Sequence, residues 1–204
     1  MRELSVILVA LIMFGVTIRY CYLINTRAKH PVPATWIIIS LTMILGFITY
    51  MRSPVHSWTG NVGNATGVLN TSVICFFVLW TRYRDGELKL AFSRFQKGTL
   101  VAAAGIILFW MMFRQASWSN VLTQLLVVIG YIATLQHLWT SPKNTEPFSV
   151  WIGTGIAMLI ALYPALIDGD SLAVLYATRA TVTTLLVVAF MLRIEYRQRM
   201  MVFA

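Results

Sequence analysis

Long apolar runs alternate with short polar stretches along the whole chain. A helix needs about 20 largely apolar residues to cross a bilayer. We therefore predict an all-α membrane protein with seven spanning helices, of which the fourth is the shortest. Their expected ranges are 4–24, 34–51, 61–80, 99–113, 120–139, 147–167 and 171–192. We expect the first run to be a retained helix and not a signal peptide, because aromatic residues and no small-residue cleavage site follow it.

Composition agrees with a lipid environment. Of the 204 residues, 58% are hydrophobic and 11% are charged, whereas a soluble domain carries about 25% charged residues. The net charge of +9 would suggest nucleic-acid binding in a soluble protein. Here the basic residues lie in short loops between apolar runs, where they orient the protein in the bilayer. We therefore expect the lipid bilayer, and no nucleic acid, as a partner. Cys21 and Cys75 lie in apolar runs without metal-ligand spacing, so we expect buried thiols and no disulfide.

The loop charges predict an orientation. With seven helices, one face carries the first, third and fifth connections and the C-terminus. Its basic residues are Arg27, Lys29, Arg82, Arg84, Lys89, Arg94, Lys97, Lys143, Arg193, Arg197 and Arg199. The other face carries Arg2, Arg52 and Arg114. Because cytoplasmic loops are enriched in Lys and Arg, we expect the N-terminus outside and the C-terminus in the cytoplasm, in a plasma or inner membrane.

The longest polar stretch, residues 81–98, leaves two alternatives open. Leu88, Ala91, Phe92 and Phe95 recur at helical spacing among basic residues. Such a pattern is typical of a short helix that lies in the membrane interface. A solvated loop is the other interpretation.

An internal repeat organises the predicted helices. The segment TRAKHPVPATWIIIS (26–40) is similar to TSPKNTEPFSVWIGTGI (140–156), and both lead into a helix with an early tryptophan. An offset of 115 pairs Trp36 with Trp151, Met43 with Met158 and Asn64 with Arg179. We predict two parallel three-helix bundles, 1–82 and 118–204, joined by a basic loop and linker helix at 83–117. Chance similarity between apolar segments remains the alternative.

The turn SPKNTEPFSVW (141–151) and this three-one-three arrangement resemble the superfold of SWEET sugar transporters, PQ-loop proteins and bacterial nicotinamide riboside transporters. The chain has no Pro-Gln pair and no proline inside its first and fifth helices. The resemblance implies a small, mostly neutral substrate that binds near the midplane between the bundles. It also implies that Asn64 contacts the substrate. Arg179 would replace the matching asparagine and favour a more polar or anionic solute.

Arg179 is the sharpest signal from the residues themselves. It lies eight residues after Ser171, about 12 Å into its helix at 1.5 Å per residue. A charge at such depth costs about 2.5–3.5 kcal/mol on insertion scales and usually faces a bundle interior. Tyr176 and Thr183 share its face at helical spacing. The side chain either contacts a ligand in a central cavity or is satisfied by carbonyl groups or by Asp168 or Asp170.

Polar stripes mark two other helices. Asn61, Asn64 and Thr71 share a face of the third helix, beside the close-packing pattern Gly63-x-x-x-Gly67. This stripe either binds substrate or links helices. In the fifth helix the polar positions are Gln124, Tyr131 and Gln136, with Gln124 near the outer end.

Trp36 and Trp151 open the second and sixth helices. They either belong to the aromatic belt at the membrane interface or, as the resemblance suggests, form a stacking wall for a ring-shaped substrate.

These observations favour a facilitative small-molecule transporter. No acidic residue lies deep in a predicted helix, which argues against a carboxylate proton relay, and no phosphate-loop or catalytic motif occurs. We therefore expect no enzyme activity and no cofactor. The predicted substrate-binding residues are Trp36, Asn64, Thr71, Trp151, Tyr176, Arg179 and Thr183. The alternative is a non-transporting receptor or assembly subunit that binds a partner through its basic cytoplasmic face. Either can form a homo-oligomer.

Overall fold

A computed structural model of the chain describes residues 1–28, 31, 33–54, 56–88, 90, 92–140, 144 and 146–202. The side chains of 133–134, 136–137, 140 and 201–202 are not described either. Lys29, Lys89, Ala91, Lys143 and the side chain of Gln136 therefore lie outside the described residues, as does most of the turn at 141–145.

The described residues fold into seven helices, which confirms the predicted all-α class. They are α1 (Arg2–Asn25), α2 (Pro33–Met51), α3 (Val62–Arg84), α4 (Arg94–Phe113), α5 (Ala116–Thr140), α6 (Phe148–Ile167) and α7 (Ser171–Val202). Six of them are long and apolar enough to cross a membrane, and in α5 the apolar stretch over Ala116–Ile132 is shorter. The protein is therefore an integral membrane protein that crosses the bilayer several times.

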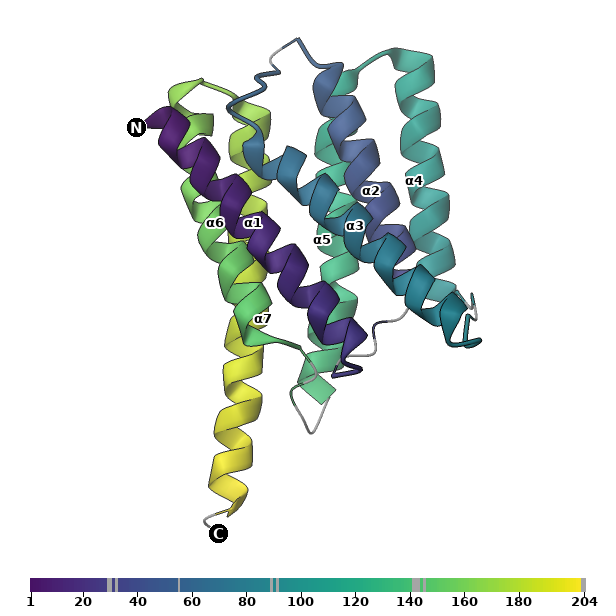
Figure 1. Cartoon of the computed structure of the whole chain (residues 1–204). Coiled ribbons are helices and arrows are strands. Elements are labelled where there is room, and N and C mark those ends of the chain that lie inside the picture. Colours follow the sequence, from purple (N-terminus) through teal and green to yellow (C-terminus); the bar gives the residue numbers. More distant parts are fainter. Residues whose placement is uncertain are drawn as a thin grey trace.

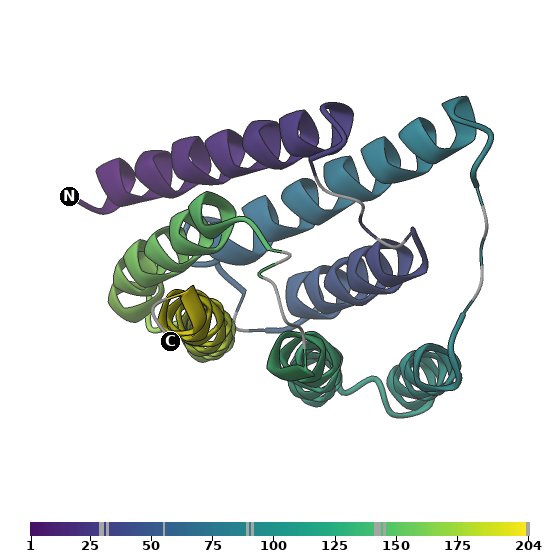
Figure 2. The same ribbon diagram turned by 90° about the horizontal axis from the view of Figure 1, so that it is seen from below.

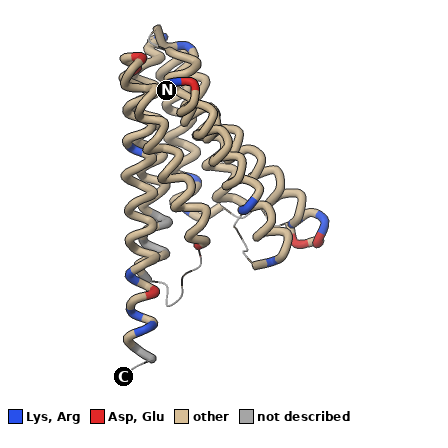
Figure 3. Tube along the Cα trace, turned by 60° about the vertical axis from the view of Figure 1, so that its left-hand side comes forward, with Lys and Arg blue, Asp and Glu red and all other residues tan. Residues whose placement is uncertain are grey.

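Successive helices run in opposite directions, so the two termini lie at opposite ends of the molecule (Figure 1). The N-terminus and the α2–α3, α4–α5 and α6–α7 connections share one end, which we call the N-terminal end. The other end carries most of the basic residues (Figure 3), and we call it the basic end. This grouping agrees with the loop charges, whereas the side of the membrane that each end faces stays a prediction.

The helices pack as two three-helix bundles. In the first bundle α3 contacts both α1 and α2, and in the second α7 contacts both α5 and α6. The bundles meet through α1 against α6 and α2 against α5, and α3 touches α7 (Figure 2). Exchanging α1 with α5, α2 with α6 and α3 with α7 reproduces these contacts, but α3 also touches α6, and among the described residues α7 makes no comparable contact with α2. The linker helix α4 packs against α5 and α2. The domain limits at 82 and 117 stay a prediction.

Two helix ends differ most from the expected ones. Helix α4 begins five residues earlier than expected because the Ser93 hydroxyl accepts a hydrogen bond from the Gln96 backbone N–H while the Gln96 side chain binds the Ser93 N–H. Between α3 and α4 the described residues, which are 85–88, 90, 92 and 93, are not helical and form a loop, whereas Phe95 belongs to the first turn of α4. Helix α7 continues to Val202 and projects beyond the other helices (Figure 1).

The largest buried cluster lies where the bundles meet. Its fully buried members are Val9, Met13, Met43, Val62, Ala157, Met158, Ala161, Tyr176, Ala177 and Ala180. Five helices contribute to it, and the alanines of α6 and α7 let their neighbours approach closely. Met43 and Met158, which the repeat offset pairs, both belong to this cluster.

Candidate functional site

Arg179 lies in the interior between α5 and α7. Its Nε donates a hydrogen bond of 2.8 Å to Oε1 of Gln124, and its guanidinium carbon is 4.8 Å from the centroid of the Tyr176 ring. Gln124 and Arg179 each come eight residues after the start of their helix. Both helices start at the N-terminal end, so the two side chains reach the same depth.

No carboxylate among the described residues neutralises Arg179. All seven acidic residues belong to the described part of the chain, and the ion pairs found there join other arginines. Asp168 binds Arg2, and Asp170 accepts a hydrogen bond from the Tyr50 hydroxyl. The interpretation in which one of these two acids satisfies Arg179 is therefore wrong. Among the described residues, the amide oxygen of Gln124 and the side chain of Tyr176 lie beside its charge.

The Tyr176 ring occupies a slot on α3 that two glycines create. A Cβ at Gly63 would lie 3.5 Å from Cε1 of Tyr176 and 3.1 Å from Cβ of Ala161. A Cβ at Gly67 would collide with the Tyr176 hydroxyl oxygen. The Gly63-x-x-x-Gly67 pattern thus admits a tyrosine from α7 as well as the close approach of α6, where the sequence predicted helix packing alone.

The contact between α2 and α5 is also polar. The side-chain amide of Asn120 donates a hydrogen bond of 2.7 Å to the Gly46 carbonyl oxygen. A Cβ at Gly46 would lie 3.5 Å from Nε2 of Gln124, so Gln124 lies between α2 and Arg179. The Oδ1 atom of Asn120 is buried without a hydrogen-bond partner among the described residues. We call Asn120, Gln124, Tyr176 and Arg179 the central polar cluster, which joins α2, α3, α5 and α7.

The predicted site residues divide into two groups by position. Tyr176 and Arg179 belong to the central polar cluster, and Asn64 is buried on α3 between the two slot glycines. The hydroxyl of Thr71 donates to the Gly67 carbonyl oxygen at 3.0 Å, and that of Thr183 donates to the Arg179 carbonyl oxygen at 2.9 Å. Both threonines therefore bind their own helices, as threonine in a membrane helix commonly does. Their role towards a ligand stays a prediction.

Trp36 and Trp151 lie inside the bundles, nearer the basic end. Trp36 packs against Tyr20 with ring centroids 5.2 Å apart, and Trp151 meets the edge of Tyr131 at 6.0 Å. Both are half-buried, whereas Trp58 and Trp118 are 73% and 64% exposed, as expected of belt residues. Each thus forms an aromatic pair with the first helix of its own bundle. Whether they line a substrate path stays a prediction.

Sequence reasoning did not assign Gln124 and Asn120 to the site. An intramembrane amide needs a polar partner, so both residues carried a signal. Their partners lie on α7 and α2, and the rotation of each helix about its axis decides which partner is reached.

A second polar cluster ties the bundles together at the N-terminal end. Asp168 accepts hydrogen bonds from Arg2 at 2.7 Å, Ser57 at 2.6 Å and Thr59 at 3.1 Å. Burial opposes ionisation of Asp168, but these donors outweigh it and hold the pKa of the carboxyl below its usual value. We call these four residues the clasp, because they join the α2–α3 connection to the α6–α7 turn.

Comparison of the chain with protein-family models, curated proteins and solved structures finds no match. The evidence for the three-one-three packing is therefore the helix contacts of this structure alone. The resemblance to the SWEET superfold does not assign the chain to a family.

Proposed function

We propose that the protein is a facilitative transporter of small anionic solutes, with a substrate site at the central polar cluster. The observation that carries this proposal is the half-buried Arg179, which has an amide and a ring beside it and no carboxylate partner in the described chain. A guanidinium holds several donors in a fork that matches a carboxylate. An anion would supply the charge that the protein leaves out.

The arrangement of the bundles supports alternating access. The cluster lies where α2, α3, α5 and α7 meet, so residues from both bundles surround it. The clasp holds the bundles together at the N-terminal end, through contacts that are few and polar. With the clasp closed, the site would be open towards the basic end. Opening the clasp while the basic end closes would expose the same site at the N-terminal end. Uptake without proton coupling remains our expectation, because no carboxylate lies at that depth.

The aromatic neighbours suggest which anion to test first. Tyr176 lies against Arg179, and Tyr131 is the next tyrosine around the same interior. A planar ring with one carboxylate can use both the guanidinium and these rings. Benzoate is therefore a suitable probe, and benzamide is its neutral counterpart of the same shape.

The test is ligand-dependent thermal unfolding of the purified chain in detergent. Benzoate should raise the unfolding temperature, and benzamide at the same concentration should not. Arg179→Gln should lower benzoate affinity by at least about tenfold, since hydrogen bonds to charged groups contribute about 1.5–3 kcal/mol. Arg179→Lys should fall between, because it keeps the charge and loses the fork.

Arg114→Gln is the control, because it removes a positive charge from an exposed position at the end of α4. It should leave the benzoate response unchanged. Equal responses to benzoate and benzamide, or an unchanged response in Arg179→Gln, would contradict the proposal.

A second candidate function, a non-transporting receptor or assembly subunit, is favoured by the length of α7. The helix continues past the predicted membrane limit to Val202 and carries Arg193, Arg197 and Arg199 there. Such a helix is suited to holding an acidic partner. This candidate predicts no ligand at Arg179, so the benzoate experiment separates the two functions.

A further inference from the structure

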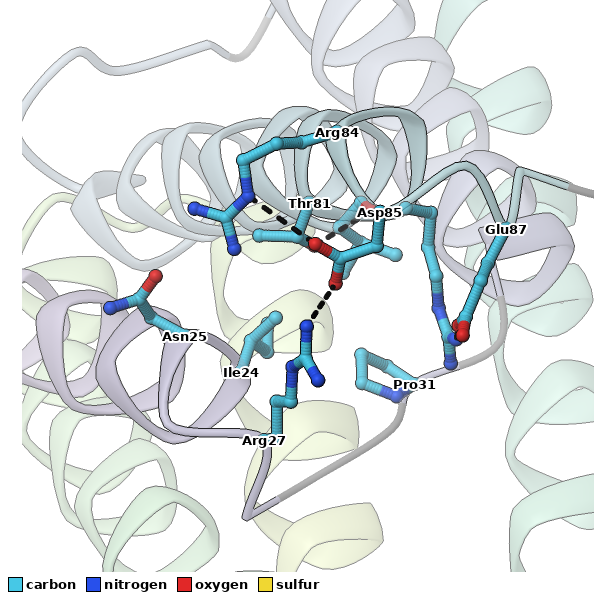
Figure 4. A pocket seen from close by; sticks show the side chains of 10 residues that line it. Ile24, Asn25, Arg27, Pro31, Thr81, Arg84, Asp85 and Glu87 are labelled. Carbon is cyan, nitrogen blue, oxygen red and sulfur yellow. Dashed lines mark hydrogen bonds and ion pairs between the residues drawn. The ribbon is translucent and has the colours of Figure 1, made fainter.

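Three arginines converge on a cavity at the basic end, between the last turns of α1 and α3 (Figure 4). The cavity measures about 70 Å³, which is room for more than one water at about 30 Å³ each. Arg27, Arg82 and Arg84 line it together with Asp85 and Glu87. The five side chains sum to one net positive charge, so the cavity favours an anion.

Two of the three arginines in this cavity make only long ion pairs. Arg27 and Arg84 approach opposite oxygens of Asp85 at 3.4 Å each, whereas a charge-assisted hydrogen bond is about 2.7–2.9 Å long. The third, Arg82, is paired with Glu87 at 2.6 Å. Arg27 is 70% exposed at its side chain. Its backbone has φ +56°, a conformation that costs a residue other than glycine about 1–2 kcal/mol. An arginine is thus held at the end of α1 where glycine would fit better.

A long apolar groove lies beside this cavity, along the outside of α1 and α3. Its volume is about 920 Å³. Leu11, Phe14, Ile18, Leu69 and Val73 line it and are exposed. Asn25 lines both the groove and the cavity, so the two lie next to each other.

The groove is at least as long as one leaflet is deep. From Ala10 to Asn25 the α1 wall rises about 22 Å at 1.5 Å per residue, whereas half of a hydrocarbon core is about 15 Å. An acyl chain that enters at the basic end therefore has the groove beside it through the whole depth of its leaflet.

We propose that this groove and cavity form a binding site for an anionic phospholipid. Its phosphate lies between Arg27 and Arg84, beside the pair of Arg82 with Glu87, and an acyl chain lies between α1 and α3. The site is independent of transport and of the central polar cluster. A free phosphate would leave the apolar groove empty, and a second copy of this chain would bring its own basic end against the arginines. A phospholipid satisfies both the charge and the apolar surface.

The experiment is native mass spectrometry of the purified full chain in detergent with added lipid. The probes are phosphatidylglycerol and phosphatidylcholine with identical acyl chains. Phosphatidylglycerol should bind at least about tenfold more tightly. Arg27→Gln combined with Arg84→Gln should weaken its binding by about fivefold for each arginine, since a basic residue near an anionic lipid surface contributes about 1 kcal/mol. Gel filtration checks that each variant stays folded.

Matched variants distinguish lipid binding at this site from an effect of the net charge or of the overall surface hydrophobicity of the protein. Arg197→Gln with Arg199→Gln removes the same charge from exposed positions of α7 at the same end, and should change affinity by less than about twofold. Leu69→Trp should fill the groove and weaken binding of both lipids. Leu185→Trp, at a position exposed to a similar extent, 61% against 66%, should not.

Three outcomes would overturn the proposal. Equal affinity for the two lipids would remove the role of the arginines. An equal loss in the Arg197/Arg199 variant would reduce the effect to net charge. Displacement of phosphatidylglycerol by inorganic phosphate alone would mean a phosphate site without a lipid.

Discussion

At the residue scale, the contact between Gly67 and Tyr176 decides how close α3 and α7 come. The slot has no space for another carbon beside the Tyr176 hydroxyl, and Tyr176 in turn carries Arg179 on its face. The glycine pattern was visible in the sequence because small residues at i and i+4 are typical of helix contacts. Its occupant was not, because Tyr176 comes from the other bundle and only the folded chain brings it there.

We expect Gly67→Ala to destabilise the protein by about 1–3 kcal/mol, the usual cost of overpacking a core. Combining it with Tyr176→Phe should recover part of that loss, because the hydroxyl that the new methyl meets is gone. Thermal unfolding in detergent measures both effects. Gly105→Ala on α4 is the control, since nothing lies within 4 Å of its added Cβ. An equal loss at Gly105 and Gly67 would mean that the slot is not the cause.

At the element scale, helix cores follow from the sequence and helix ends do so only in part. Seven apolar runs predict seven helices because, in lipid, a helix satisfies all the backbone hydrogen bonds of a segment within that segment. The early start of α4 was readable from Ser93 and Gln96, which form a capping box. The polar end of α7 carries no apolar signal, although Glu195 and Arg199 stand at the i, i+4 spacing that supports a helix.

The connections at the N-terminal end carry a pH-dependent prediction. Asp168 has a lowered pKa in the folded protein, so its clasp contacts stabilise fully above the ordinary aspartate pKa of about 3.9. That stability is lost as the pH falls through the lower, folded pKa. At neutral pH, Asp168→Asn should cost about 1–2 kcal/mol, since charged hydrogen bonds contribute that much and Arg2 is partly exposed.

Unfolding of wild type and Asp168→Asn from pH 8 to pH 3 measures this effect. The difference between the two proteins should stay constant down to about pH 5 and shrink below about pH 4. A difference that persists unchanged at the lowest pH would show that the carboxylate charge does not hold the clasp.

At the scale of the whole molecule, the matched packing of the two bundles gives each helix a counterpart except α4. The sequence offset found this relation from Trp36 and Trp151, and Met43 and Met158 fall in one cluster. Pairings between bundles, such as α2 with α5, could not be read from the sequence, because every apolar face is an equal candidate in lipid. The choice of Gln124 as the partner of Arg179 follows from the contact of α5 with α7 inside the second bundle.

Cysteine accessibility tests whether the bundles open. Cys21 and Cys75 are free thiols and are first replaced by alanine. Thr183→Cys, close to Arg179, should react with a membrane-impermeant thiol reagent from the basic end. Adding Arg2→Gln and Asp168→Asn should open the clasp and shift the reaction to the N-terminal end.

Val182→Cys is the matched control, because Val182 is 50% exposed on the outside of α7 and faces lipid, where the reagent has no access. Silence of Thr183→Cys on both sides, with and without the clasp variants, would contradict alternating access.

The length of α7 makes it a lever. One unbroken helix starts beside the clasp, passes the central arginine and ends at Val202, about 48 Å away at 1.5 Å per residue. A tilt of about 10° at its origin would sweep the tip through about 8 Å. Ligand binding inside the membrane would thus move the C-terminal tip of α7 outside the membrane. A spectroscopic label on Tyr196 or Met200 can follow this movement.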